Sequence, residues 1–315
     1  MEEFTQYLTS GLALGAIYGL VALGFVVIYR ASQVFNFAHG ELLTFGAVMM
    51  VYLSAPPAAD VGSGLGAPTV SGLGLPWGLA LVLSMVFTGL IATGIERVGL
   101  RPLVGRPVFV PIIVTLFVGA VLRTIVMLVF GNDAMPLLTP WDSMGAFRFG
   151  TAILDFNSMG AIVAGALAFI GFGLLIRYTR LGVAMRATAS DQETSLGLGI
   201  PVGKILGLTW FIAGAFAALA GIFLGIRDYS VDMNLGFIAL RAFPAVIVGG
   251  LDSAVGAVVA GLLLGVLEVM TAAYVNAALG PMGKNLHTVF PYLVMIVFLV
   301  VRPYGLFGTT KVERV

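Results

Sequence analysis

The stretch GLALGAIYGLVALGFVVIYRASQVFNFAHGELLTFGA, Gly11–Ala47, joins a long apolar run to a short polar one. The first part, up to Arg30, is long enough to cross the ~30 Å hydrocarbon core of a membrane as a helix. The second part places Asn36, His39 and Glu41 directly after that run. Polar side chains are costly inside a bilayer and usually face a protein interior or a water-filled path. The stretch therefore predicts a membrane helix followed by an irregular span near the middle of the membrane.

The composition places the whole chain in a membrane. Of its 315 residues, 59% are hydrophobic and 10% are charged, whereas about 25% are charged in a typical soluble domain. The formal net charge of +1 gives no reason to expect nucleic acid as a partner. The chain has no cysteine and two histidines, so we expect neither a disulfide nor a metal site. The composition predicts an integral membrane protein in contact with lipid.

Apolar segments of spanning length recur along the chain. Because a membrane helix needs about 20 mostly apolar residues, we predict an all-α, polytopic protein with about 8–9 transmembrane segments, some of them broken or re-entrant. The expected segments are 8–29, 34–53, 77–95, 108–130, 159–176, 205–226, 236–249, 254–270 and 286–301. No phosphate-binding P-loop is present in the sequence. We therefore expect residues 1–315 to form a single transmembrane domain.

Basic residues are distributed unevenly between the two predicted sides. Lys and Arg collect in cytoplasmic loops, and eleven of the sixteen fall on one side against three on the other. The eleven are Arg30, Arg97, Arg101, Arg106, Arg177, Arg180, Arg186, Lys204, Arg302, Lys311 and Arg314. The bias predicts an external N-terminus and a cytoplasmic C-terminus.

Glycines recur at fixed spacing in three of the predicted helices. They are Gly11, Gly15 and Gly19; Gly207, Gly214 and Gly221; and Gly261 and Gly265. In lipid, small residues at such spacing let helix backbones approach closely. We expect tight packing within the chain, and the alternative is that one of these faces meets a second subunit.

The loop 177–204 is the longest charged stretch and lies on the predicted cytoplasmic side. Residues about 184–197 have the pattern of an amphipathic helix, which Gly197, Gly199 and Pro201 would end. Such a helix can insert into a groove on a soluble partner. The alternative is an ordinary interfacial loop.

A second break is expected near residue 250. Pro244 disfavours helix continuation after Arg241, and Gly249 and Gly250 allow positive φ in a turn that ends at Ser253. Segment 236–249 is short, follows a helix rich in small residues and ends at glycines, as segment 34–53 does. We predict that the two segments are equivalent members of an internal repeat.

Three stretches together resemble the branched-chain amino-acid permease family of ABC importers. The loop resembles the family's coupling loop at Arg186, Ala187, Ala189, Asp191, Gly199 and Ile200. The stretch NFAHGE resembles an N-terminal signature at Asn36, Phe37, Ala38, His39, Gly40 and Glu41. A second signature is matched by Arg241, Ala242, Phe243, Gly249, Gly250, Ser253, Gly256 and Ala257. The chain lacks the glutamate that begins the general coupling motif, and Asp252 stands where glycine is common in relatives.

The resemblance is to the LivH-type subunit and implies an importer in a bacterial inner membrane. The chain would pair with a homologous LivM-type permease, two cytoplasmic ATPase subunits would dock on the coupling loop, and an extracytoplasmic solute-binding protein would deliver substrate. The chain itself would bind no cofactor, because ATP is held by the ATPase subunits. The implied substrates are hydrophobic or branched-chain amino acids or related small solutes such as urea and amides, moved by alternating access and not by an enzymatic reaction.

The polar residues inside the apolar segments have two interpretations. Asn36, His39 and Glu41 either line the substrate path or satisfy each other and nearby backbone. On a regular helix Glu41 would point away from the other two, so either it bonds a neighbouring helix or the segment is broken. The other path candidates are Tyr18, Thr115 and Phe243. We expect Arg123 to extend toward the membrane surface and Glu268 to have a structural role.

Two other classes of function stay open on the sequence. A self-contained secondary transporter or channel would need an ion-coupling carboxylate, for which Glu41 is the single candidate. An intramembrane enzyme would need a catalytic pair, and no nucleophile or metal set is found near Glu41. With few charges expected along the path, selectivity would lie mainly with the binding protein.

Overall fold

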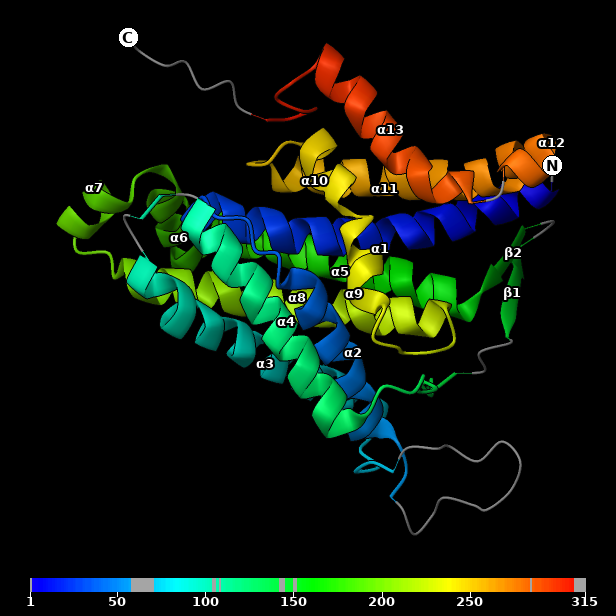
Figure 1. Cartoon of the computed structure of the whole chain (residues 1–315), viewed down its shortest axis with the longest axis horizontal. Helices are drawn as coiled ribbons and strands as arrows, with labels where there is room; N and C mark the ends of the chain where they lie inside the picture. Colours follow the sequence, from blue (N-terminus) through cyan, green and yellow to red (C-terminus); the bar gives the residue numbers. More distant parts are fainter. Residues whose placement is uncertain are drawn as a thin grey trace.

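Two helices lie at the centre of the molecule. They are α1 (Glu2–Ser32) and α8 (Val202–Arg227), and most of each is buried by its neighbours. The computed structural model describes residues 2–57, 71–103, 106–107, 109–141, 145–149, 152–283 and 285–308. Figure 1 shows α1, α8 and α11 lying along the long axis and α2, α3, α4 and α13 inclined to it, with the N-terminus and a small hairpin at one end and α6 and α7 at the other. We call these the hairpin end and the α6–α7 end.

The remaining helices surround this pair. They are α2 (His39–Ser54), α3 (Trp77–Ile95), α4 (Phe109–Phe130), α5 (Phe156–Tyr178), α6 (Arg180–Ser190), α7 (Gln192–Gly197), α9 (Leu235–Leu240), α10 (Phe243–Gly249), α11 (Ala254–Met270), α12 (Asn276–Leu279) and α13 (Leu286–Val301). Six helical segments are long and apolar enough to span a membrane, and two further apolar segments are shorter. The all-α, multi-pass prediction is therefore confirmed.

Most predicted segments match the observed helices closely. Segments 77–95, 254–270 and 286–301 coincide with α3, α11 and α13. The irregularity of 34–53 is confirmed, because its helix begins only at His39. Segment 236–249 is split into α9 and α10 at Arg241–Ala242, where Pro244 was expected to disfavour helix continuation. An antiparallel hairpin of β1 (Ala146–Phe149) and β2 (Ala152–Asp155) was not predicted.

The second half of the chain repeats the packing of the first with helix directions reversed. In the first half α2 packs on α3 and on α4; in the second α10 packs on α11 and on α13. Across the halves, α1 packs on α11 and α8 packs on α3. Helix α1 ends at the end of the molecule where α8 begins, and Gln192, the first residue of α7, donates to the carbonyl of Ala31 at 2.8 Å. This packing supports the predicted repeat, which has the inverted form found in many transporters.

The glycine spacings serve contacts within the chain. A Cβ on Gly15 would lie 2.7 Å from the Cα of Leu262, and one on Gly261 would lie 2.6 Å from the Cα of Gly19. On α8, a Cβ on Gly214 would lie 2.8 Å from the carbonyl oxygen of Thr88. Helices α1 with α11 and α8 with α3 therefore cross with their backbones nearly in contact.

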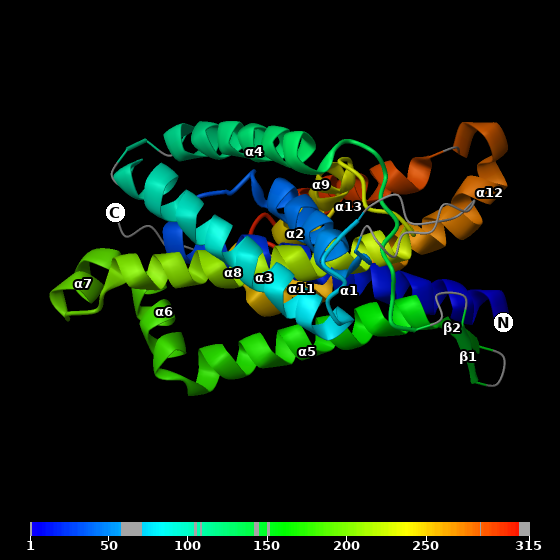
Figure 2. The ribbon, with the colours of Figure 1, turned by 90° about the horizontal axis from the view of Figure 1, so that it is seen from below.

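Helices α4 and α5 lie on opposite outer sides of the bundle, as Figure 2 shows. Little of either helix is buried. Their exposed apolar side chains include Phe117, Leu128, Leu167 and Ile170. These faces are suited to lipid or to another apolar surface.

The predicted amphipathic helix at 184–197 is two helices, which corrects that prediction. Helix α6 ends at Ser190 and α7 starts at Gln192. Between them Asp191 has extended backbone (φ −157°, ψ 117°), and its carboxylate accepts from the backbone N–H of Thr194 at 3.1 Å. Asp191 thus acts as the N-cap of a new helix and cannot continue the old one.

Candidate functional site

The chain makes a tight turn just before α2. The side-chain oxygen of Asn36 accepts from the backbone N–H of Ala38 at 3.1 Å. The hydroxyl of Thr115, on α4, accepts from the backbone N–H of Phe37 at 3.3 Å. Helix α2 then begins at His39 without a side-chain cap. The predicted site residues Asn36 and Thr115 therefore act on the same turn from two sides.

Several polar atoms at this turn are buried without a hydrogen-bond partner. They are Nδ2 of Asn36, both ring nitrogens of His39 and Oε2 of Glu41. The ring of His39 lies 4.5 Å from that of Phe25 and fills the space over Gly24. Unpaired buried polar groups are costly and mark places where a water, ion or ligand binds.

Glu41 faces a basic residue on the neighbouring helix α4. Its Oε1 lies 3.5 Å from Nη1 of Arg123. The guanidinium of Arg123 also lies over the ring of Phe237, on α9, 4.7 Å from the ring centre. Arg123 thus pairs within the bundle instead of extending to the membrane surface, which corrects the prediction for this residue. The ion pair uses one carboxylate oxygen of Glu41, and the other oxygen, Oε2, has no hydrogen-bond partner among the described residues.

The two broken segments meet at a pair of glycines beside this ion pair. A Cβ on Gly40 would lie 2.5 Å from the carbonyl oxygen of Gly236, and one on Gly236 would lie 3.1 Å from Oε1 of Glu41. Since only glycine leaves this space, the start of α2 and the start of α9 lie backbone to backbone. The turn and the ion pair therefore form one site with the N-terminal end of α9.

A second charged pair lies at the other end of α9. Glu268, on α11, accepts from the hydroxyl of Tyr18 at 2.8 Å. Its other oxygen lies 4.0 Å from Nη1 of Arg241, directly after α9. Tyr18, predicted as a path residue, is almost fully buried and acts here through Glu268. Helix α9 thus has an acid–base pair at each end.

An aromatic cluster forms around Phe243, two residues after Arg241. The ring of Phe243 lies 5.9 Å from that of Phe25, 5.9 Å from that of Phe35 and 6.3 Å from that of Phe37. These distances are typical of packed aromatic side chains. The predicted residue Phe243 is therefore next to the turn that Asn36 forms, and it offers an apolar surface between polar groups.

The second break is built as predicted in most respects. Pro244 lies in the first turn of α10, Gly250 has a φ of +103°, and the hydroxyl of Ser253 accepts from the N–H of Gly256 at 3.0 Å to cap α11. Gly249 does not have positive φ. It is needed for space, because a Cβ there would lie 2.5 Å from the backbone nitrogen of Ala257.

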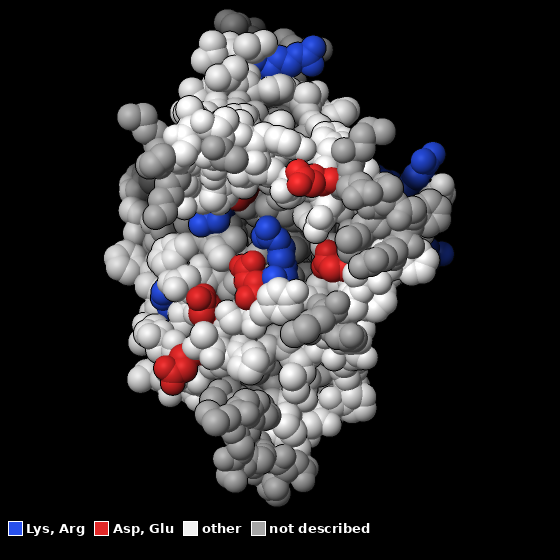
Figure 3. All heavy atoms as spheres, turned by 90° about the vertical axis from the view of Figure 1, so that its right-hand side faces the viewer, with Lys and Arg blue, Asp and Glu red and all other residues white. Residues whose placement is uncertain are grey.

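Charged side chains gather on the face at the hairpin end. Figure 3 shows acidic and basic groups around the middle of this face, within a surface that is otherwise mostly uncharged. Helix α8 ends here at Arg227, whose Nη1 lies 3.9 Å from Oδ1 of the next residue, Asp228. Ion pairs therefore lie at this end of the molecule and at both ends of α9.

The predicted coupling residues lie at the α6–α7 end, away from the site formed by α2, α4 and α9. Arg186 donates to the carbonyl of Ile176 and so ties α6 to the end of α5. Ala187 and Ala189 lie on α6, Gly197 ends α7, and Gly199 follows with a φ of +80°. Hydrogen bonds from Thr194 hold the pKa of Asp191 below its ordinary value. These residues share one protruding corner of the molecule (Figure 2).

The comparisons with known proteins decide the family. A model described as "Branched-chain amino acid transport system / permease component" matches residues 7–299. The chain belongs to this permease family. It is 32% identical to the Pseudomonas aeruginosa high-affinity branched-chain amino acid transport system permease protein BraD, over 99% of this chain and 98% of that one. It is 30% identical to LivH of Escherichia coli K12 over the same shares, and 28% identical to a probable LivH of Methanocaldococcus jannaschii over 92% and 88%.

Sequence reasoning did not identify which residues form the two charged pairs of this permease. Arg123, Arg241 and Glu268 were each treated as isolated or as part of a signature, because partners from different helices are not visible in a linear pattern. A signal was present, since a charged residue in an apolar span is a functional candidate by default. Pairing each such residue with an opposite charge elsewhere in the spans would have found both pairs.

Proposed function

We propose that this chain is the permease subunit of an ATP-driven importer of hydrophobic and branched-chain α-amino acids. The proposal rests on the Glu41–Arg123 pair, because it offers a free carboxylate oxygen to an ammonium group and a guanidinium to a carboxylate. The relatives named above are permeases for branched-chain amino acids. Two opposite charges side by side fit a zwitterion better than an uncharged solute such as urea.

The substrate would pass along α9, between this chain and a homologous partner permease. Phe237 of α9 is 56% exposed and its ring lies against Arg123. The side chains of Arg123 and Glu41 are 25% and 15% exposed, so the pair is partly accessible from the surface of the chain. The rings around Phe243 would receive the apolar side chain. His39 is fully buried in the present conformation, so contact with the substrate would require α1 and α2 to separate.

The driving motion would enter at the other end. Two ATPase subunits would dock on α6 and α7, and an extracytoplasmic binding protein would deliver substrate at the hairpin end. The basic residues of the α6–α7 end, among them Arg97, Arg106, Arg180 and Lys204, favour a cytoplasmic position for that end. Arg186 joins α6 to α5, so a push on the docking helices would move α5 as well.

Transport by the reconstituted complex tests this function. The chain is co-expressed with the permease, ATPase and binding-protein subunits encoded beside it, and uptake of labelled leucine into proteoliposomes is measured with and without ATP. We expect uptake that needs both ATP and the ATPase subunits. Uptake of equal rate without them would instead establish a self-contained transporter.

Substitution of the ion pair tests the site. Glu41→Gln and Arg123→Gln should each lower leucine uptake about tenfold or more, because a hydrogen bond to a charged group contributes about 1.5–3 kcal/mol. Arg302→Gln, an exposed arginine directly after α13, is the matched control and should leave uptake unchanged. If both ion-pair variants assemble with their partners and transport at the parental rate, the pair is not the binding site.

A further inference from the structure

A cavity of about 250 Å³ opens at the α6–α7 end, apart from the site at α9. It is enclosed by the end of α1, the turns after α3, the start of α4, α7 and α8. Six of its lining residues are largely apolar: Val34, Leu100, Leu103, Pro111, Leu206 and Trp210. The other lining residues are Ser32, Gln33, Glu96, Arg101, Arg106 and Gln192. A water-sized space takes up about 30 Å³, so the cavity has room for a small organic molecule.

Two of the lining side chains have no partner in the part of the chain that the structure describes. Trp210 is 1% exposed, and its indole N–H makes no hydrogen bond there. Arg106 lines the cavity as an exposed residue, and its guanidinium has neither an ion-pair partner nor a hydrogen bond among the described residues. An indole N–H donor and a cation, both without a partner among the described residues, are suited in one cavity to an acceptor with negative charge.

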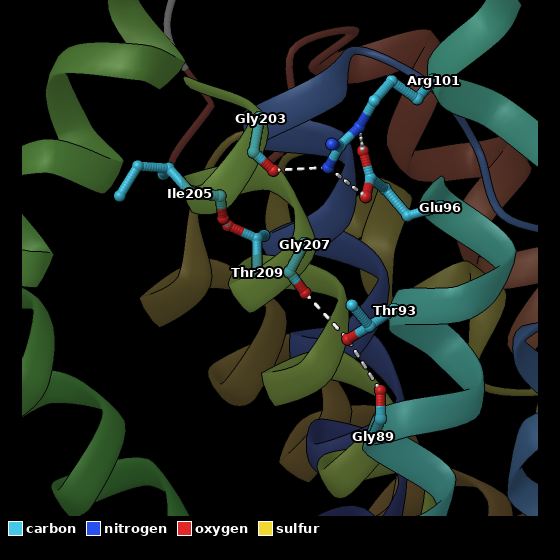
Figure 4. A network of polar contacts seen from close by, with 8 residues as sticks. All are labelled: Gly89, Thr93, Glu96, Arg101, Gly203, Ile205, Gly207 and Thr209. Atoms are coloured by element: carbon cyan, nitrogen blue, oxygen red, sulfur yellow. Dashed lines mark hydrogen bonds and ion pairs between the residues drawn. The ribbon is translucent and has the colours of Figure 1, made fainter. Parts of the chain in front are cut away.

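The other charges of the cavity are already committed. Figure 4 shows Arg101 held by Glu96 and by the carbonyl of Gly203. Nη2 of Arg101 lies 2.9 Å from Oε2 of Glu96 and 2.6 Å from the oxygen of Gly203, and its Nε lies 3.1 Å from Oε1 of Glu96. This pair is therefore neutral as a unit, and Arg106 gives the cavity its net positive charge.

We propose that this cavity binds a small carboxylate with a branched apolar tail. The carboxylate would pair with Arg106 and accept from the indole of Trp210, and the tail would lie on the leucines. The binding site goes beyond the proposed function, whereas the cytoplasmic side of entry and the effect on import rest on it.

Occupancy would fix the position of α7. Gln192, the first residue of α7, lines the cavity and ties α7 to α1 through the carbonyl of Ala31. Arg101 holds α8 to the end of α3 from the same cavity. A ligand here would lie between the docking helices and the bundle, so it would slow import when it accumulates inside the cell.

The chain offers its own fluorescent reporter for this site. It has three tryptophans, and the other two, Trp77 and Trp141, lie together with ring centres 5.3 Å apart. In the full-length chain with Trp77→Phe and Trp141→Phe, Trp210 emits alone. The chain in lipid nanodiscs is titrated with 4-methylpentanoate at constant ionic strength, with leucine in a second titration and the uncharged 4-methylpentanamide in a third.

We expect a saturable change in Trp210 emission with 4-methylpentanoate and none with the amide. Arg106→Gln should weaken binding about tenfold or more, since it removes a charged hydrogen-bond partner, and Arg106→Lys should restore part of it. Arg97→Gln is the matched control, because Arg97 lines a neighbouring hollow and not this cavity. Saturation by leucine as well would identify imported amino acids as one source of the ligand.

The absence of a saturable change would overturn the proposal. The proposal would also be overturned if 4-methylpentanoate changed Trp210 emission equally in the Arg106→Gln and Arg97→Gln variants. An equal emission change with the amide would overturn it too, because the signal would then report partition of the compound into lipid. In the reconstituted complex, 4-methylpentanoate trapped inside the vesicles should slow uptake, and Arg106→Gln should relieve this. Unchanged uptake despite binding would overturn the regulatory part. Binding is measured without ATP or transport, so its failure is distinct from failure of the proposed function.

Discussion

Gly15 shows how a single residue sets the approach of two helices. A side chain there would press on the backbone of Leu262, which cannot move aside as a flexible side chain can. The spacing predicted a close contact, but lipid, a second subunit and another helix of the same chain all suit a small-residue face. Only the position of α11 shows that the contact is internal.

Gly15→Ala should therefore destabilise the protein. Forcing a methyl group into this contact costs about 1–3 kcal/mol, which lowers the thermal midpoint measured in detergent. Gly171→Ala is the control, because a Cβ at Gly171 on α5 meets nothing within 4 Å. That variant should gain about 0.5–1 kcal/mol from helix propensity. Equal midpoints for the two variants would contradict the close crossing of α1 and α11.

The ion pairs at α9 are a residue-scale result that no linear pattern contains. Glu41 and Arg123 come from different helices, and Glu268 and Arg241 come from distant segments. Each pair is brought together only by the packing of those segments. The sequence indicated that Glu41 would bond another helix or lie in a broken segment. Both alternatives are observed, because α2 begins only at His39 and Glu41 pairs with Arg123 on α4.

At the scale of elements, the joint between α6 and α7 departs most from its prediction. The amphipathic pattern runs through Asp191, but aspartate is a better N-cap than a helix-interior residue. Its carboxylate accepts from both the backbone N–H and the hydroxyl of Thr194, the latter at 2.7 Å. The local hydrogen bonds thus prevail over the continuous pattern and form a bend.

Asp191→Ala should loosen α7 while Asp191→Asn preserves it, because asparagine is also a good N-cap. Hydrogen exchange of residues 192–197 measures this, and faster exchange is expected in the alanine variant alone. The pKa of Asp191 is held below its ordinary value of 3.8, so the cap is complete at neutral pH. It should be lost only as the pH falls through the folded-state pKa. Equal exchange in both variants at pH 7 would show that the cap is not needed.

On the scale of the whole molecule, the inverted repeat explains why the charged pairs lie where they do. Each half contributes a central helix followed by a broken segment, and the two broken segments meet at Gly40 and Gly236. The repeat also separates the ends, with the docking helices at one and the hairpin at the other (Figure 1).

The proposed orientation can be checked by cysteine labelling, because the chain has no cysteine of its own. Phe147→Cys, on β1, and Leu196→Cys, on α7, each place a thiol at a position that is more than half exposed. A membrane-impermeant maleimide should label Phe147→Cys in intact spheroplasts. It should label Leu196→Cys only after lysis, and the opposite result would reverse the orientation.

The sequence by itself determined the class of protein, the apolar spans, the sites of both breaks and the family. These follow from local composition, from helix-breaking residues and from motifs, all of which act over a few residues. Tertiary structure alone decided which charges pair, that the glycine faces are internal, that Asp191 ends a helix and that a cavity with an unpaired arginine lies beside α7. Those features depend on contacts between residues far apart in the chain, where the free energy comes from packing and partner choice and not from local propensity.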